Sequence, residues 1–285
     1  MDEILTSSWK QVEQAIDRAL AEDVSFGDVT TEALIPSDQQ GRASIIAKQE
    51  GILGGVEVAK EVFLRVDPSI QFEASVQDGA KVRKNDVVAV IEGKVASILK
   101  GERVALNFLT RLSGIASETA RYVEATEGLK ARITDTRKTT PGIRALEKYA
   151  VRVGGGKSHR QHLGDGILIK DNHLAALRSL GVGLKEAIER ARQRSTLKIE
   201  VEVESVEQAR VALDAGADVI MLDNMAIEDM RQVVELAQGR ALIEASGGIT
   251  LDNVRQVAEA GVDLISVGAL THSARSLDLS LEVEV

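Results

Sequence analysis

The second half of this chain repeats a single pattern, in which a short β-branched segment is followed by an amphipathic helical segment. Four such segments end in a polar residue or a glycine, at intervals of 21 to 23 residues. The four ends are Glu202, Asp223, Ser246 and Gly268. This interval is the length of one compact βα unit, and strands that alternate with helices form a parallel sheet. The pattern therefore predicts an α/β fold built on a parallel sheet.

Two upstream segments, 131–137 and 166–172, have the same character and predict two further strands of this sheet. The total of five or six units falls short of the eight in a complete α/β barrel, so we expect a smaller or irregular barrel. In such a fold the functional groups collect at the carboxyl ends of the strands. The predicted strands all end in charged, polar or glycine residues at that end.

The first 110 residues lack this repeat and predict a separate, smaller α+β domain. A helix is expected over residues 9–22, followed by alternating apolar and polar segments that are typical of strands. A second helix, expected over residues 101–123, links the two halves of the chain.

Composition excludes several classes of function. Aromatic residues make up 2% of the chain and its formal net charge is −9, which disfavours a nucleic-acid-binding surface. The absence of cysteine excludes disulfides, zinc–thiolate sites and cysteine nucleophiles. No apolar run approaches the roughly 18 residues of a membrane span, and residues 1–20 are too acidic for a signal peptide. We therefore expect a cytoplasmic protein that binds neither membranes nor nucleic acid.

One region of this acidic chain is strongly basic. From Lys130 to Arg160 there are nine Lys or Arg residues and two acids, which gives a local charge balance of +7. Arg144, Lys148 and Arg152 recur at helical spacing, and we interpret them as a solvated helix face.

The other basic residues of interest lie beside predicted strands and turns, with one histidine among them. They are Arg137, Lys138, His159, Arg160 and Lys170. Converging cations are costly unless anions compensate them, and an arginine binds a carboxylate through two parallel hydrogen bonds. The set therefore predicts a pocket for a small ligand that carries two or more negative charges. The alternative is neutralisation by three nearby acids, which are Asp135, Asp165 and Asp171.

Two carboxylates, Glu202 and Asp223, end successive predicted strands. This placement suits Mg²⁺, which takes one or two protein oxygens and completes its shell with water and phosphate, or it suits hydrogen bonds from ribose hydroxyls. Glu200 and Glu204 alternate with Glu202, so all three are expected to face one side of a strand. For Glu200 and Glu204 the alternative is pairing with a nearby lysine.

Glycine-rich segments follow the last two predicted strands, at Ser246–Gly248 and Val267–Ala269. Backbone amides at such points bind phosphate, and the last two strands of an α/β barrel are its usual phosphate site. The segment Gly154–Gly156 is either another such loop or a flexible connection.

A series of motifs extends in order along nearly the whole chain. They read EDVSFGDVTT, GERVALNFLTRLSGIAS, TDTRKTTPGIRALEKYAV, GGGKSHRQHLGDGILIKDNH, VEVES, IMLDN, EASGGI and GVDLISVGALTHS. Together they resemble the motifs of the quinolinate phosphoribosyltransferase family. The resemblance implies an N-terminal α/β open sandwich over residues 1–112, joined by the C-terminal tail 273–285. It also implies an incomplete, about seven-stranded α/β barrel over residues 113–272, which carries the active site.

The resemblance also assigns roles to individual residues. Those implied to bind quinolinate are Thr136, Arg137, Lys138, His159, Arg160 and Lys170. Arg103 is implied to complete the substrate site of the neighbouring subunit. The implied ligands of the ribose and of Mg²⁺, held directly or through water, are Glu202 and Asp223. The implied phosphate-binding residues are Ser246, Gly247, Gly248, Val267, Gly268 and Ala269. The residues implied in catalysis are Lys138, Glu202 and Asp223.

The implied reaction is phosphoribosyl transfer from phosphoribosyl pyrophosphate to quinolinate, with decarboxylation. Its products are nicotinate mononucleotide, pyrophosphate and CO₂, as in de novo NAD biosynthesis. The resemblance further implies Mg²⁺ as cofactor, no organic cofactor, and a homo-oligomer that is a dimer or a hexamer of dimers, with Arg103 shared across the interface. Two alternatives remain open. One is a sister phosphoribosyltransferase for another pyridine or associated with molybdate transport, and the other is a Schiff-base lyase that uses Lys170.

Overall fold

The computed structural model describes residues 8–284 and divides the chain into two compact units. The first unit comprises Met1–Ala120, Lys138–Gly155 and Ala269–Val285, and the second comprises Arg121–Arg137 and Gly156–Gly268. Residues 1–7 and 285, at the ends of the predicted N-terminal domain and its C-terminal tail, lie outside the described residues. The domain boundaries expected at residues 112 and 272 stay predictions.

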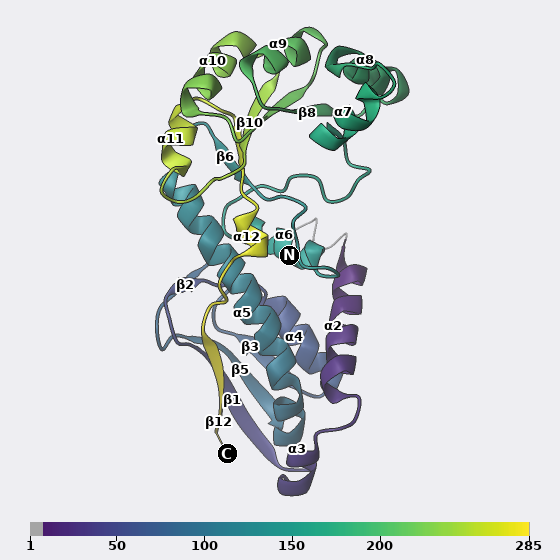
Figure 1. Cartoon of the computed structure of the whole chain (residues 1–285). Coiled ribbons are helices and arrows are strands. Elements are labelled where there is room, and N and C mark those ends of the chain that lie inside the picture. Colours follow the sequence, from purple (N-terminus) through teal and green to yellow (C-terminus); the bar gives the residue numbers. More distant parts are fainter. Residues whose placement is uncertain (1–7, 285) are drawn as a thin grey trace. The chain divides into compact units, whose positions relative to one another are not determined.

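The first unit contains an antiparallel sheet and several helices (Figure 1). Its strands are β1 (Gln40–Ala47), β2 (Gly51–Ile52), β3 (Gln71–Ala74), β4 (Lys81–Val82), β5 (Val87–Lys94) and β12 (Leu279–Glu284). Its helices are α2 (Trp9–Val24), α3 (Val29–Leu34), α4 (Val56–Val66), α6 (Arg144–Val153), α12 (Ala269–His272) and most of α5 (Val95–Ala125).

The main sheet of this unit has the strand order β12-β1-β5-β3, so the last strand of the chain lies beside the first. The pairing of β1 with β12 extends from Arg42 opposite Glu284 to Ala47 opposite Leu279. The α+β character expected for the first part of the chain is confirmed, and its sheet also includes a strand from the far end of the sequence.

Helix α5 is longer than expected, because it begins at Val95 rather than at residue 101. The side chains of Val95 and Ile98 are 3% and 0% exposed, so the buried stripe of the helix extends to its first turn. Strand β5 ends at Lys94, and helix follows strand with no loop between them.

Helix α6 contradicts one expectation. We interpreted Arg144, Lys148 and Arg152 as a solvated face, yet the Lys148 side chain is fully buried. Every residue from 146 to 151 is buried, so the helix is covered on several sides and offers no solvated stripe. The adjacent Glu147 is also buried, and it accepts hydrogen bonds from Arg111 at 2.8 Å and from the Thr140 hydroxyl at 2.8 Å.

The second unit contains a parallel sheet whose strands alternate with helices, as the repeat predicted (Figure 1). Its strands are β6 (Arg132–Thr134), β7 (Ile167–Ile169), β8 (Ile199–Val203), β9 (Val219–Asp223), β10 (Leu242–Ser246) and β11 (Leu264–Ser266). Its helices are α7 (Asp171–Arg178), α8 (Leu184–Arg194), α9 (Val206–Asp214), α10 (Ile227–Ala237) and α11 (Val254–Glu259).

The strand order in this sheet is β6-β11-β10-β9-β8-β7, and every neighbouring pair is parallel. On the free side of β6, Thr134 forms an isolated parallel bridge with Lys157. The six strands expected from the repeat and its two upstream segments are confirmed. The resemblance implied about seven strands, and in the part of the chain that the structure describes only this isolated bridge occupies the place of a seventh.

Aspartates set the register of this sheet by the same device at two places. Asp218, just before β9, accepts the backbone N–H of Ile199 in β8 at 2.7 Å. Asp263, just before β11, accepts the backbone N–H of Ile243 in β10 at 2.9 Å. The backbone N–H of each aspartate donates to the carbonyl of the same residue, at 2.9 Å to Ile199 and at 2.8 Å to Ile243, so each aspartate is joined to the start of the neighbouring strand by two hydrogen bonds.

Gly114 of α5 packs directly against the segment that leads to β12, so Gly114→Ala is expected to destabilise the protein. A Cβ atom at this position would lie 2.1 Å from the carbonyl oxygen of Arg275. The segment cannot move away freely, since the Leu277 backbone N–H donates to the Thr110 carbonyl at 3.0 Å. We expect a loss of about 3 kcal/mol in the free energy of unfolding, measured by urea denaturation.

The matched control for this substitution is Gly183→Ala, where φ is −90° and no atom lies within 4 Å of the added Cβ. Its expected cost is below about 1 kcal/mol. Equal stability of the two variants would contradict the close packing at Gly114.

Across residues 8–284, the structure contains no helix that combines the length and the apolar character needed to cross a membrane.

Candidate functional site

The carboxyl ends of the parallel strands lie at one edge of the second unit's sheet, because all six strands run in the same direction. Most predicted site residues lie at this edge. Thr136 and Arg137 follow β6, Lys170 follows β7, Glu202 is in β8, Asp223 ends β9, Ser246 ends β10, and Val267 and Gly268 follow β11. Three predicted residues belong instead to the first unit, namely Arg103 in α5, Lys138 and Ala269 at the start of α12.

Glu202 and Asp223 lie on adjacent strands, but their carboxylates have different partners. Glu202 forms an ion pair with Lys170, whose Nζ atom lies 2.7 Å from Oε2. Asp223 accepts a hydrogen bond at 3.1 Å from the side-chain amide of Asn224. In the register of the sheet Asp223 is opposite Ser246, the residue before Gly247.

The expectation that three alternating glutamates share one face holds for two of them. Glu200 is buried and Glu202 is half-buried, whereas Glu204 is exposed. Strand β8 ends at Val203, so Glu204 lies outside the strand and no longer follows its alternation. The pairing with lysine that we considered for Glu200 and Glu204 is made by Glu202 instead.

His159 lies in the segment between the Lys157 bridge and β7, and its ring contacts two buried carboxylates. Its Nε2 atom is 3.1 Å from Oε2 of Glu200 and 3.5 Å from Oε2 of Glu244. Its backbone N–H donates to Oδ1 of Asp135 at 2.8 Å, which fixes the segment to the end of β6. Burial opposes the charged form, but the contacts with Glu200 and Glu244 prevail and raise the pKa of His159 to about 10.

Glu244 is not among the site residues predicted from the sequence. It is a lone acid between Ile243 and Ala245 in a predicted strand, and its side chain is fully buried. A charged residue in the middle of an apolar strand was the available signal, because a buried charge needs a partner.

Arg137 and Arg160 carry guanidinium atoms that have no partner within the described range 8–284. The Nε atoms of both side chains are buried and make no hydrogen bond there. Arg160 uses Nη1 to donate to the Gly166 carbonyl at 3.0 Å. Burial is the main influence on the pKa of Arg160 and lowers it. The nearby charge of Glu200 raises this pKa, and the charge of Arg137 lowers it. Buried unpaired N–H groups of two neighbouring cations are suited to an anionic ligand.

The acids that we considered as neutralising partners have other roles as well. Asp165 accepts the backbone N–H groups of Gln161 at 2.5 Å and of His162 at 3.1 Å, and it thereby closes a tight turn. Asp171 accepts the backbone N–H of Asn172 at 2.6 Å. Together with the contact of Asp135 to the His159 backbone, these bonds shape the loops that carry the cations.

The loop after β10 requires glycine. Gly247 has a φ of +87° and Gly248 a φ of +60°, which lie in the left-handed region. A Cβ atom on Gly247 would lie 2.4 Å from the side chain of Asn224. The backbone N–H of Asn224 donates to the Ser246 carbonyl at 2.9 Å. The Asn253 side chain donates to the Gly248 carbonyl at 2.9 Å. The loop is therefore held from two sides.

Gly154, in contrast, is a packing residue of the first unit. A Cβ atom there would lie 2.3 Å from the Ala116 carbonyl oxygen in α5. Close approach of two backbones explains this glycine.

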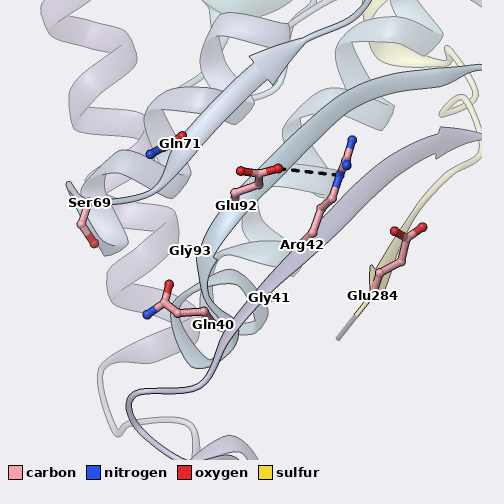
Figure 2. Close-up of a pocket in the computed structure, with 8 residues that line it drawn as sticks. All are labelled: Gln40, Gly41, Arg42, Ser69, Gln71, Glu92, Gly93 and Glu284. Atoms are coloured by element: carbon pink, nitrogen blue, oxygen red, sulfur yellow. Dashed lines mark ion pairs between the residues drawn. The ribbon is translucent and has the colours of Figure 1, made fainter.

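Figure 2 shows a pocket of the first unit, formed along β1, β3, β5 and β12. It is lined by Gln40, Gly41, Arg42, Ser69, Gln71, Glu92, Gly93 and Glu284. An ion pair of 3.8 Å joins Arg42 to Glu92, and both side chains are more than half exposed. None of the predicted site residues lines this pocket.

Comparison with known proteins identifies the family. Residues 28–113 match the model described as "Quinolinate phosphoribosyl transferase, N-terminal domain", and residues 115–282 match that of the C-terminal domain. The chain belongs to the quinolinate phosphoribosyltransferase family. The two family models therefore adjoin within α5, at residues 113 to 115.

Members of the quinolinate phosphoribosyltransferase family resemble the chain over almost its full length. A probable nicotinate-nucleotide pyrophosphorylase [carboxylating] of Bacillus subtilis is 45% identical over 275 residues, which are 96% of this chain and 93% of the relative. The quinolinate phosphoribosyltransferase [decarboxylating] 2b of Nicotiana tabacum is 40% identical, covering 96% of this chain and 82% of the relative. The crystal structure of NadC from Streptococcus pyogenes superposes with a TM-score of 0.91 at 44% identity, covering 96% of both chains.

Proposed function

We propose that this chain transfers a phosphoribosyl group from phosphoribosyl pyrophosphate to quinolinate and releases CO₂, as a decarboxylating pentosyltransferase. The observation that carries the proposal is the pair Arg137 and Arg160, whose buried Nε atoms lack hydrogen-bond partners within residues 8–284. Together with His159 and Lys170 these cations suit a ligand with two carboxylates. Membership of the family and the names of its 40–45% identical relatives support the same activity.

In the proposed reaction, the ring nitrogen of quinolinate attacks C1 of the ribose with its lone pair while the bond from C1 to pyrophosphate breaks. Pyrophosphate leaves with the bonding electrons. The positive pyridinium nitrogen then accepts electron density, so the adjacent carboxylate departs as CO₂ and a proton from solvent replaces it at the ring carbon. The product is nicotinate mononucleotide, and no oxidant or reductant is required.

The residues contribute mainly by position and charge. Arg137, His159, Arg160 and Lys170 hold the two carboxylates of quinolinate in the proposed complex. Lys138, next in sequence to Arg137, is proposed to act on the departing pyrophosphate. The loop at Ser246–Gly248 and the segment Val267–Ala269 are proposed to bind phosphate through backbone N–H groups.

Glu202 and Asp223 are proposed to bind the ribose hydroxyls and Mg²⁺. Both side chains offer carboxylate oxygens, the ligand type that Mg²⁺ prefers, at the ends of adjacent strands. Lys170 pairs with Oε2 of Glu202, which leaves Oε1 as the oxygen proposed to bind the metal ion, directly or through water. When bound, Mg²⁺ neutralises charge on the phosphate oxygens.

We also propose a cytoplasmic homo-oligomer, a dimer or a hexamer of dimers, in which Arg103 completes the site of the neighbouring subunit. The Arg103 side chain is 67% exposed and lies 3.9 Å from Glu102, its ion-pair partner. An exposed guanidinium with such a weak local contact is available to a second chain.

The Schiff-base lyase alternative finds no support in the geometry. Imine formation needs a neutral amine, whereas the Lys170 ammonium pairs with the Glu202 carboxylate at 2.7 Å. A sister phosphoribosyltransferase for another pyridine remains the second candidate, and substrate choice separates it from the proposal.

The proposed function predicts turnover of quinolinate and none of nicotinate. Loss of one carboxylate leaves a buried cation unpaired and removes charged hydrogen bonds worth about 1.5–3 kcal/mol each, so binding should fall by at least about tenfold. In addition, nicotinate has no second carboxylate to release. The measurement is labelled CO₂ from carboxyl-labelled quinolinate with phosphoribosyl pyrophosphate and Mg²⁺, and nucleotide formation from nicotinate in parallel. Comparable turnover of nicotinate would contradict the proposal.

A further inference from the structure

The cluster formed by His159, Glu200 and Glu244 includes two carboxylates to which the proposed reaction gives no role. Glu244 is in β10 opposite Met221 of β9, and Glu200 is in β8 opposite Val219 of β9. Met221 and Val219 are two residues apart, so both glutamates are directed to the same face of the sheet. The two carboxylates approach His159 from strands on either side of β9.

Two carboxylates contact the imidazole, and a third holds the backbone of the same residue. Glu200 lies within 3.3 Å of Nε2 through Oε1 and within 3.1 Å through Oε2. Glu244 lies 3.5 Å away, a distance typical of an ion pair rather than of a hydrogen bond. Asp135 fixes the backbone of the same residue at 2.8 Å.

Burial makes the charge state of this cluster decisive. Glu244 is 0% exposed, and neither of its oxygens has a hydrogen-bond partner in the described part of the chain. An ionised carboxylate in such a place needs a compensating charge, or it becomes protonated. The ring of His159 provides that charge at 3.5 Å. The other charged groups around the ring are Glu200, Asp135 and the neighbouring Arg160, which itself interacts with Arg137.

We propose that Glu244 is a positioning residue of the substrate site, which acts with Glu200 to hold His159 in place as a permanent imidazolium. His159 then contributes a positive charge to the carboxylate-binding cations at every pH at which the enzyme works. This inference rests on the proposed function, because it concerns how that site holds a dicarboxylate. It is supported by the contacts with the two glutamates, which outweigh the effect of burial and raise the pKa of His159 to about 10.

The direct test is a pH titration of the four histidines, labelled with ¹⁵N and ¹³C, by NMR spectroscopy, with His159→Gln used to assign the signal. In the native protein the His159 ring is expected to stay doubly protonated from pH 6 to pH 9. In Glu244→Gln the ring should lose its proton at lower pH, because one of its two anionic partners is gone. This measurement requires no turnover, so it also judges the inference if quinolinate is not the substrate.

The second test is the KM for quinolinate as a function of pH. In Glu244→Gln it is expected to rise by about tenfold or more toward pH 9, where a neutral ring no longer forms a charged hydrogen bond. The KM for phosphoribosyl pyrophosphate should change by less than about twofold, since loss of a purely structural residue would raise both. Glu204→Gln is the matched control, because Glu204 is exposed just beyond β8 and should leave both profiles unchanged.

Three results would overturn the inference. The first is a neutral His159 ring at pH 7 in the native protein. Because this result comes from the native protein, it would overturn the inference even if Glu244→Gln fails to fold. The second is an unchanged titration and an unchanged KM profile in folded Glu244→Gln. The third is stoichiometric binding of Zn²⁺, measured by calorimetry and lost in Glu244→Gln, which would make the cluster a metal site.

Discussion

Arg160→Ala is expected to weaken quinolinate binding by about a hundredfold or more, while binding of phosphoribosyl pyrophosphate changes by less than about threefold. The guanidinium of Arg160 is anchored to the Gly166 carbonyl and has a buried, unpaired Nε atom, so it is placed for a carboxylate. Its removal also leaves Glu200 with less positive charge nearby. Asp223→Ala should have the opposite selectivity, because that carboxylate is proposed to bind the ribose and Mg²⁺.

Titration calorimetry with each ligand separates these outcomes. Arg210→Ala is a suitable control, since that arginine is half exposed in α9 and pairs with Glu207 at 3.7 Å. It should bind both ligands as the native protein does. Loss of the same ligand in Arg160→Ala and Asp223→Ala would show that the two residues do not belong to separate subsites.

Subunit mixing is expected to restore activity to two variants that are inactive alone. Arg103→Ala removes a cation that is proposed to reach the partner's site, and Lys138→Ala removes one from the chain's own site. Each substitution damages every site of its homodimer, so each should retain less than about 1% of kcat/KM. In a mixed dimer one site has both Lys138 of one chain and Arg103 of the other.

After unfolding and reassembly of equal amounts, half of the dimers should be mixed and roughly a quarter of all sites complete, given a closed two-fold interface. The measurement is the recovered fraction of quinolinate turnover, with self-mixed samples of each variant treated identically. Mixed dimers are detected by mass-tagging one chain. If they form and activity does not return, Arg103 does not act across a subunit interface.

Local sequence patterns predicted the second unit well. The spacing of strands and helices predicted five or six parallel strands, and the sheet has six. Parallel direction alone brings Glu202, Asp223 and Ser246 to one edge. The first and last residues of the helices were less predictable. Helix α5 begins at Val95 because other parts of the first unit cover the side chains of its first turn. Sequence periodicity does not show where such packing begins.

Features that depend on distant partners were not predictable. The residues next to Glu244 in the sequence do not indicate a role for it. Its role follows from its contact with His159, which lies 85 residues earlier in the chain. The burial of Lys148 has the same origin, because helical spacing shows that three cations share a face and does not show whether another element covers that face. Likewise, nothing local to residues 279–284 indicates that they pair with β1.

The pairing of β12 with β1 has a consequence for how the chain is made in the cell. The N-terminal part of the polypeptide leaves the ribosome first. Residues 40–47 therefore emerge long before residues 279–284, the strand that pairs with their free edge. Until residues 279–284 follow, β1 exposes a row of unsatisfied N–H and C=O groups, which is a site for mispairing with another nascent chain. The first unit is therefore completed last, although most of its residues are synthesised first.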